Sequence, residues 1–299
     1  MANNINFYDI AFIGHYTKDT IVSAKGTRIV DGGAFNYGAN VAARMGLKVA
    51  AVTRSAEEDL RVVEKLKHLG VDVSVHISPQ STCLRLEYPT ANIDERIIYV
   101  TSSAGPFTLA EVKNLQARAI VVGASMRDEV SLEVIKELAK KKTILTADVQ
   151  SFIRVNYNSK LILQEWPEKQ SILSHLDVLK TDAVEAEMLT GISNLREAAL
   201  KISDLGPHEV VITHHNGLLV YANGQFYEKC FYPKKLIGRS GRGDTCIAAY
   251  MAKRLNASPQ EATIWAAAVT SLKMEAEGPF QRTIQEVNNL IQSKYRNLN

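Results

Sequence analysis

The chain has 299 residues, of which 46% are hydrophobic and 22% are charged, and its formal net charge is +3 at pH 7. This length suits one large α/β domain with an ample core. The small net charge and the short apolar runs exclude a strong preference for nucleic acid and a membrane span.

The N-terminus has no basic region followed by an apolar stretch, so we expect a cytoplasmic protein. The three cysteines, Cys83, Cys230 and Cys246, form no close pair along the sequence. This spacing argues against a disulfide framework and against a zinc site.

The first third of the chain predicts strands and helices with two hairpins between them. Alternating residues at 16–31 and at 82–101 predict exposed hairpins, the second with its turn at 92–95, and we expect the two to form one lid. The remaining predicted elements here are strands at residues 8–14, 48–53 and 71–77 and helices from the Gly32-Gly33 turn to Met45 and at residues 57–69.

Strands and helices then alternate, which is typical of a parallel sheet with crossover helices. The sequence Asn223-Gly224 predicts a tight turn between two antiparallel strands within residues 218–231. The other predicted elements are strands at residues 119–123, 143–148, 177–180 and 209–213 and helices at residues 131–140, 183–189, 194–205, 245–255, 258–275 and 283–295. We expect residues 1–299 to form a single domain with an appended lid.

The stretch GRSGRGD at residues 238–244 has the composition of an anion-binding turn. Gly241 and Gly243 allow positive φ angles and let backbone N–H groups converge, and the following helix adds the positive end of its dipole. Asp244 would repel an anion unless it takes up a proton during the reaction, as a base does for an attacking hydroxyl. We interpret the stretch as an anion cradle with a catalytic base; the alternative is an Asp that only caps a helix.

Other polar residues follow the ends of predicted parallel strands. Ligands of doubly wound sheets bind beyond these carboxyl ends, where we expect Gly14, Asp148, Lys180 and Thr213 to emerge. Asp19 lies just past the first end. It either accepts hydrogen bonds from two hydroxyls of a sugar or polyol, or it is a solvated loop carboxylate.

Three motifs resemble, in order and spacing, the signatures of the ribokinase family, also called the PfkB-type carbohydrate kinases. The double-glycine signature resembles GGAFNYGANVAARMG at residues 32–46, the NxxE element resembles Asp182-Ala183-Val184-Glu185, and the C-terminal DTTGAGD signature resembles residues 238–244. The resemblance spans nearly the whole chain.

This resemblance implies a three-layer α/β/α sandwich with a mainly parallel central sheet, a small β-lid, and transfer of the γ-phosphoryl group of ATP to a hydroxyl of a sugar or polyol. Asp244 would be the general base. The other implied roles are an anion hole at Gly241, Arg242 and Gly243; substrate contacts at Asp19, Gly32, Gly33, Asn36, Tyr37 and Arg154; nucleotide contacts at Lys180, Asp182, Thr213, Gly217 and Ala267; and Mg²⁺ held through water by Glu185.

The chain departs from the family pattern at several of these positions. Arg242 replaces the usual Ala and either contacts phosphate or turns into solvent, and Gly238-Arg239 replaces Asp-Thr. Asp182 stands where the NxxE element has Asn, and His214-His215 interrupts the usual nucleotide turn. Arg154 either binds substrate or forms an ordinary surface ion pair.

The acceptor substrate is less well defined by the sequence than the reaction. Tyr37, with IGHYTKD at residues 13–19 and DVQSFIR at 148–154, favours the inositol kinase branch over ribokinase itself. The alternatives are a nucleoside kinase of the same family and a non-catalytic relative that binds sugar or nucleotide. A nicotinamide-dependent oxidoreductase is disfavoured because GHYTKD lacks the G-x-G-x-x-G fingerprint. We expect a monomer or a homodimer formed through the lid.

Overall fold

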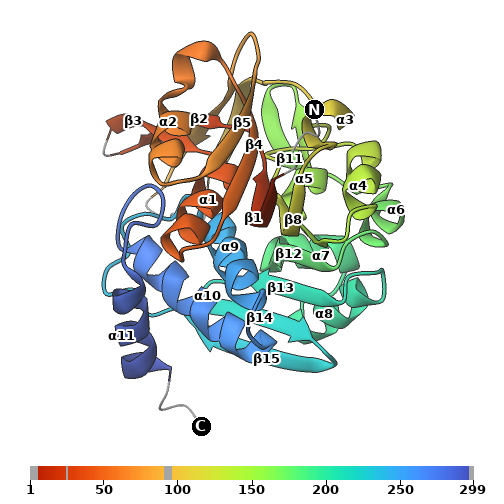
Figure 1. The fold of residues 1–299 in the computed structure, drawn as a ribbon, viewed down its shortest axis with the longest axis vertical. Helices are drawn as coiled ribbons and strands as arrows, with labels where there is room; N and C mark the ends of the chain where they lie inside the picture. The colour runs from red at the N-terminus through yellow and green to blue at the C-terminus, as the bar shows by residue number, and fades with distance from the viewer. Residues whose placement is uncertain (1–5, 25, 91–95, 296–299) are drawn as a thin grey trace.

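Two β-sheets organise the chain in the computed structural model, which describes residues 6–24, 26–90 and 96–295 (Figure 1). The large sheet has the order β15-β14-β13-β12-β9-β8-β1-β4-β5. Its strands are β1 (Phe7–Ile13), β4 (Val49–Ser55), β5 (Asp72–Ile77), β8 (Gln116–Val122), β9 (Ile144–Asp148), β12 (Val178–Asp182), β13 (Glu209–Thr213), β14 (Gly217–Ala222) and β15 (Gln225–Cys230). The strands from β5 to β13 pair in parallel, and β13, β14 and β15 pair antiparallel.

Helices cover both faces of this sheet because successive side chains of its strands point to opposite sides. In β1, Ile10 and Phe12 pack into one core cluster, and Ala11 and Ile13 pack into the other. The first face carries α1 (Ala34–Arg44), α2 (Arg61–His68), α9 (Arg242–Arg254), α10 (Pro259–Met274) and α11 (Ile284–Lys294), and the second carries α3 (Leu109–Val112), α4 (Leu132–Ala139), α6 (Lys169–Leu173), α7 (Ala183–Thr190) and α8 (Leu195–Ser203). This arrangement is the predicted α/β/α sandwich.

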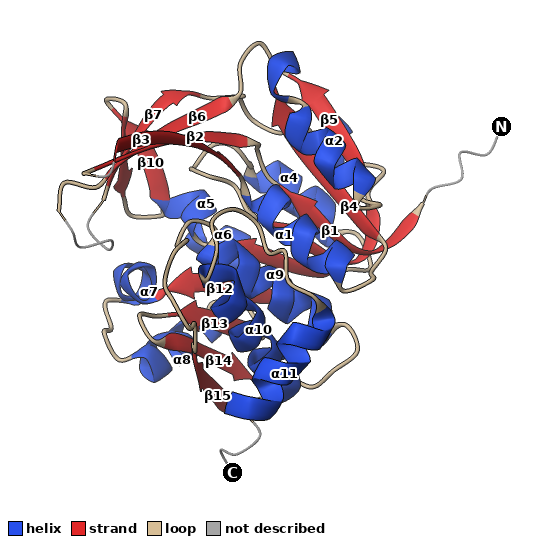
Figure 2. Ribbon diagram, turned by 90° about the vertical axis from the view of Figure 1, so that its left-hand side faces the viewer, coloured by secondary structure: helices blue, strands red, loops and turns tan. Residues whose placement is uncertain are grey.

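The smaller sheet, which we call the lid, extends over one end of the large sheet (Figure 2). Its order is β10-β11-β7-β6-β2-β3. Its strands are β2 (Thr17–Ser23), β3 (Gly26–Gly32), β6 (Thr82–Glu87), β7 (Ile97–Ser102), β10 (Arg154–Tyr157) and β11 (Lys160–Leu163). The two predicted hairpins do join one sheet, through β2 and β6, whereas the predicted turn at residues 92–95 lies outside the described residues.

A third hairpin, β10–β11, was not predicted from the sequence; it follows β9 and the short helix α5 (Gln150–Ile153). Each of its strands has four residues, and its turn places Asn158 and Ser159 at φ angles of 48° and 63°. A turn with two positive φ angles usually carries glycine, so Asn-Ser gave a weak signal.

The structure also bears on the predictions about the cysteines and about membrane-spanning helices. The cysteines Cys83, Cys230 and Cys246 are all free, as the sequence predicted. In the part of the chain that the structure describes, no helix combines the length and the apolar character that crossing a bilayer requires.

Candidate active site

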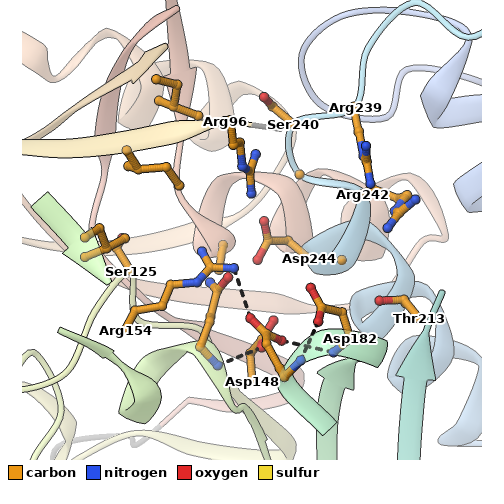
Figure 3. Close-up of a pocket in the computed structure, with 18 of the residues that line it drawn as sticks. Arg96, Ser125, Asp148, Arg154, Asp182, Thr213, Arg239, Ser240, Arg242 and Asp244 are labelled. Carbon is orange, nitrogen blue, oxygen red and sulfur yellow. Dashed lines mark hydrogen bonds and ion pairs between the residues drawn. The ribbon is translucent and has the colours of Figure 1, made fainter. Parts of the chain in front are cut away.

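A pocket of about 800 Å³ lies between the carboxyl ends of the large-sheet strands and the lid (Figure 3). Of the four residues expected at these strand ends, Asp148, Lys180 and Thr213 line the pocket, whereas Gly14 is not among its lining residues. The polar residues and glycines that line the pocket include Asp19, Gly33, Tyr37, Arg96, Arg154, Asp182, Glu185, His214, His215, Arg239, Ser240, Gly241, Arg242, Gly243 and Asp244.

The anion cradle is built at the N-terminus of α9. Gly241 precedes this helix with a φ of 74°, and a Cβ atom there would lie 2.3 Å from the ring of Tyr37. The helix begins at Arg242, earlier than the predicted start at 245, so Gly243 is helical and does not have the positive φ that we expected. Gly243 instead leaves space for the end of the Lys180 side chain, because a Cβ there would lie 2.7 Å from its Nζ.

The Gly241→Ala substitution tests this close packing. We expect it to lower the free energy of unfolding by about 3 kcal/mol, because a left-handed backbone costs a non-glycine residue about 1–2 kcal/mol and the ring contact adds a similar amount. Gly46→Ala is the matched control, since Gly46 has a φ of 78° but open space around its Cβ position. Urea denaturation of both variants measures the difference, and equal losses would contradict the contact with Tyr37.

Asp244 lies in the first turn of α9 and points into the pocket together with Arg96 and Arg154 (Figure 3). Burial raises the pKa of the Asp244 carboxyl, and the charges of Lys180 and Arg154 oppose this rise. A buried carboxylate with a raised pKa accepts a proton more readily than one in water. Its position is therefore suited to a general base.

Two ion pairs form the floor of the pocket. Nζ of Lys180 lies 2.8 Å from Oδ2 of Asp148, and Nη2 of Arg154 lies 3.1 Å from Oε1 of Glu185. Burial alone would lower the pKa of Lys180, but Asp148 and Glu185 raise it, so its ammonium remains charged. The second ion pair differs from the surface pair considered for Arg154, since the Glu185 side chain is 3% exposed.

Asp182 and Glu185 also cap helix α7. The backbone N–H of Glu185 donates to Oδ1 of Asp182 over 2.8 Å, and the backbone N–H of Asp182 donates to Oε2 of Glu185 over 3.0 Å. This capping box fixes both carboxylates at the end of β12. The three-residue spacing of the NxxE element therefore has a structural role in addition to any role in binding.

The lid provides the other predicted carboxylate. Asp19 lies in β2, not in a loop, and burial raises its pKa to about 6. Its Oδ1 atom has no hydrogen-bond donor among the described residues, although it is buried. A Cβ at Gly32 would lie 2.7 Å from Oδ2 of Asp19, so a larger residue at 32 would displace this carboxylate. Asp19 is thus a buried acceptor that a ligand hydroxyl can satisfy.

The other residues predicted to contact the acceptor divide into two groups. Gly33 and Tyr37 line the pocket. Asn36 is buried in α1 and bonds within the protein, donating to the carbonyl of Asp31 and accepting from Asn40. Gly32 and Asn36 are not among the residues that line the pocket, so they support the site from behind.

Thr213, His214, His215, Arg239 and Arg242 also line the pocket, and Figure 3 shows Thr213, Arg239 and Arg242 on the same side of it. Burial lowers the pKa of the Arg239 guanidinium, and the charge of Arg242 lowers it further. Two predicted nucleotide contacts do not line this region: Gly217 begins β14 against the carbonyl of Lys229, and Ala267 is fully buried in α10. This side of the pocket is therefore cationic.

Two cations near the pocket, Arg96 and Lys273, were not predicted from the sequence. Arg96, next to the predicted lid turn, lines the pocket, and Figure 3 shows its guanidinium directed toward Asp244. Lys273 is buried in the last turn of α10 beside the cradle. A single charge in the otherwise apolar run ATIWAAAVTSLKM was the signal that could have identified it.

Known proteins resemble this chain in sequence and in fold. Residues 5–283 match the pfkB family carbohydrate kinases. The structure resembles a pyrophosphate-dependent kinase of the ribokinase family, solved with a pyrophosphate analog and myo-inositol, with a TM-score of 0.87 and 35% identity over 94% of this chain and 99% of that one. It also resembles Arabidopsis thaliana ribokinase in complex with ribose and ATP, with a TM-score of 0.77 and 18% identity over 96% of this chain and 99% of that one. The cytidine kinase of Thermococcus kodakarensis is 26% identical over 262 residues, which is 85% of this chain and 91% of that protein.

Proposed function

Because the chain belongs to the pfkB family of carbohydrate kinases and is a phosphotransferase that acts on a hydroxyl, we propose that it transfers a phosphoryl group from inorganic pyrophosphate to a cyclic polyol such as myo-inositol. The observation that carries the choice of donor is the pair of half-buried arginines, Arg239 and Arg242, at the cradle. Desolvated guanidinium groups that repel each other favour a compact, highly charged anion.

The same side of the pocket gives less support to ATP, the donor implied by the sequence resemblance. Gly217 and Ala267, which were expected to border a nucleotide, are occupied by contacts within the protein. His214 and His215 fill the turn after β13, and His214 is directed toward Glu228, 3.8 Å from its carboxylate. Pyrophosphate requires no base-binding slot, so it fits the cationic lining without these residues.

In this proposal the chain's own residues position the reactants and move one proton. Asp19, with its unsatisfied oxygen, accepts hydrogen bonds from acceptor hydroxyls under the lid. Asp244 takes the proton of the attacking hydroxyl, and the N–H groups of residues 241–243 with the α9 dipole stabilise the transferred phosphoryl group. The lid excludes water, which limits hydrolysis of the donor.

Mg²⁺, the other cofactor implied by the resemblance, would need oxygens from the donor. In the described residues no group of three or more His, Cys, Asp or Glu side chains is arranged to hold a metal. Oε1 and Oε2 of Glu185 already accept from Arg154 and from the Asp182 backbone. Asp182 and Glu185 can therefore hold the ion through water while phosphate oxygens complete its shell, which suits the preference of Mg²⁺. The ion would neutralise charge on the donor.

A panel of donors and acceptors tests the proposal. We expect pyrophosphate with myo-inositol to give a kcat/KM at least about 100-fold above that of ATP with the same acceptor, because the cationic cradle contributes charge-assisted contacts whereas Gly217 and Ala267 do not line the pocket. Arg242→Ala should raise the KM for pyrophosphate about 10–100-fold. Arg196→Ala, which removes an exposed arginine of α8, is the control and should leave this KM unchanged.

The other outcomes identify the alternatives. Turnover with ATP and none with pyrophosphate would overturn the choice of donor, and a preference for cytidine over polyols would assign a nucleoside kinase. Ligand binding by calorimetry with no turnover for any pair would indicate a non-catalytic relative.

A further inference from the structure

Lys273 connects the end of α10 to the backbone that leads into the anion cradle. Its side chain is buried, with 2% of the residue exposed. Nζ donates to the carbonyl oxygen of Gly238 over 3.1 Å and also to the carbonyl oxygen of Ser240. Ser240 is the residue before Gly241, where the chain turns into α9. One ammonium group therefore bonds two carbonyls within three residues of the cradle.

The backbone of the same segment is also attached to α10 at its beginning. The N–H groups of Ile237 and Gly238 donate to the carbonyl of Met274 over 2.9 and 3.1 Å. A Cβ at Gly238 would lie 2.1 Å from the carbonyl oxygen of Ala276, so the segment presses closely on the end of α10. Lys273 extends this attachment two residues further, to Ser240.

The aromatic ring of Tyr37 completes the arrangement. Nζ of Lys273 lies 5.5 Å from the centre of this ring, and the same ring packs against Gly241. The direct partners of the ammonium are thus two carbonyl groups and a ring face, which are all neutral. Burying an ammonium on neutral partners is costly for folding, and methionine would fill a similar volume without that cost. This cost points to a use for the charge at the cradle.

We propose that Lys273 is a positioning residue for phosphoryl transfer: its ammonium holds the backbone of residues 238–240 so that the N–H groups of the cradle point at the phosphate. The proposal rests on phosphate binding at the cradle and not on which donor carries the phosphate. It adds a role for a side chain that does not itself line the pocket with the cradle.

The surroundings of Lys273 make this attachment sensitive to pH. Burial lowers the pKa of Lys273 to about 8, Asp244 and Glu277 oppose the lowering, and Arg242 adds to it. Glu277 is itself bonded to Arg28 of the lid, and Tyr37 faces Lys273 from α1. The ammonium is therefore intact below about pH 8 and is lost as the pH rises through that value, which should weaken phosphate binding at high pH.

Three variants and one control test the proposal. Lys273→Met keeps the volume and removes the charge, Lys273→Arg keeps a charge that does not titrate near pH 8, and Lys273→Ala leaves room for an added amine. Lys253→Met is the matched control, because Lys253 also lies over an aromatic ring, 5.0 Å from Trp265, but in the last turn of α9 away from the cradle. Calorimetry measures the Kd for pyrophosphate from pH 6.5 to 9.5, and turnover is measured in parallel.

We expect Lys273→Met to raise the Kd for pyrophosphate about 10-fold or more at pH 7 and to lose the weakening of binding above pH 8, while the acceptor KM changes little. Lys273→Arg should retain most of the affinity and also lose the weakening above pH 8. Methylammonium should restore binding to Lys273→Ala, and tetramethylammonium, which has the same charge but no N–H donor, should not.

The proposal is overturned if Lys273→Met binds pyrophosphate as the unchanged protein does and keeps the same pH profile. If Lys273→Met does not fold, the Lys273→Arg pH profile decides, since an unchanged loss of affinity above pH 8 in that variant would exclude Lys273 as its source. Absence of pyrophosphate binding by the unchanged protein would contradict the proposed donor instead, and sulfate as the probe would then test the cradle with the same variants.

Discussion

Replacing Asp244 by Asn is expected to lower kcat by about 10³-fold and to change the Kd for the phosphate donor by only a few-fold. The amide has the shape of the carboxylate but cannot take up the proton of the attacking hydroxyl, and general base catalysis contributes roughly 10²–10⁴-fold. Loss of the negative charge beside the cradle should, if anything, tighten the binding of the anion. The reaction class therefore predicts a defect in kcat rather than in KM.

The pH dependence of the unchanged protein provides a second readout for Asp244. Burial raises the pKa of this carboxyl, so the base is protonated as the pH falls through its raised value, and activity falls with it. The Asp244→Asn variant should lose this acidic limb. Asp9→Asn, near the amino end of β1, is the control. Full activity in Asp244→Asn would contradict the role of Asp244 as the base.

Replacing Lys180 by Met is expected to lower the free energy of unfolding by about 3–5 kcal/mol, because Asp148 is left buried without its cation. The unpaired carboxyl then takes up a proton more readily, so the variant should become more stable as the pH falls from 8 toward 5. The sign follows from linkage: a buried acid with a raised pKa binds more protons folded than unfolded in that window. Urea denaturation at several pH values measures this.

The double variant Lys180→Met with Asp148→Asn separates stability from function. Removing both charges should recover most of the lost stability, since no unpaired charge remains in the interior. Turnover should stay about 100-fold reduced, because Nζ of Lys180 lies beside Gly243 of the cradle and provides positive charge there. Recovered turnover in the double variant would mean that Lys180 acts only through folding.

The sequence predicted the large sheet and the cradle because their signals are local. Apolar runs, Asn223-Gly224 and the glycines at 241 and 243 each act within a few residues. The third hairpin was missed because its turn, Asn158-Ser159, lacks glycine, although tertiary pairing with β7 supports it. Local propensity could not reveal a strand that the sheet itself stabilises.

Within the site, it was easier to predict which residues belong to it than to predict which residues they contact. Asp182 and Glu185 were assigned to binding, but their three-residue spacing is equally that of a capping box, and the structure uses it so. For Arg154 the sequence left open substrate binding or a surface ion pair, because it does not show which side chains are buried. The ion-pair partner, Glu185, lies 31 residues away along the chain. Ala267 was expected to contact a nucleotide because of the family resemblance, and its place in the core depends on the packing of α10.

The way in which the lid is assembled has a consequence for how the chain folds. Its three hairpins leave the large sheet at separate points, after β1, after β5 and after β9, and β2 pairs with β6 across more than sixty residues. Closing such long loops costs entropy that only a formed core can offset. We therefore expect the three hairpins to join into one lid sheet only after the large sheet has brought their ends together, so that the pocket is covered late in folding.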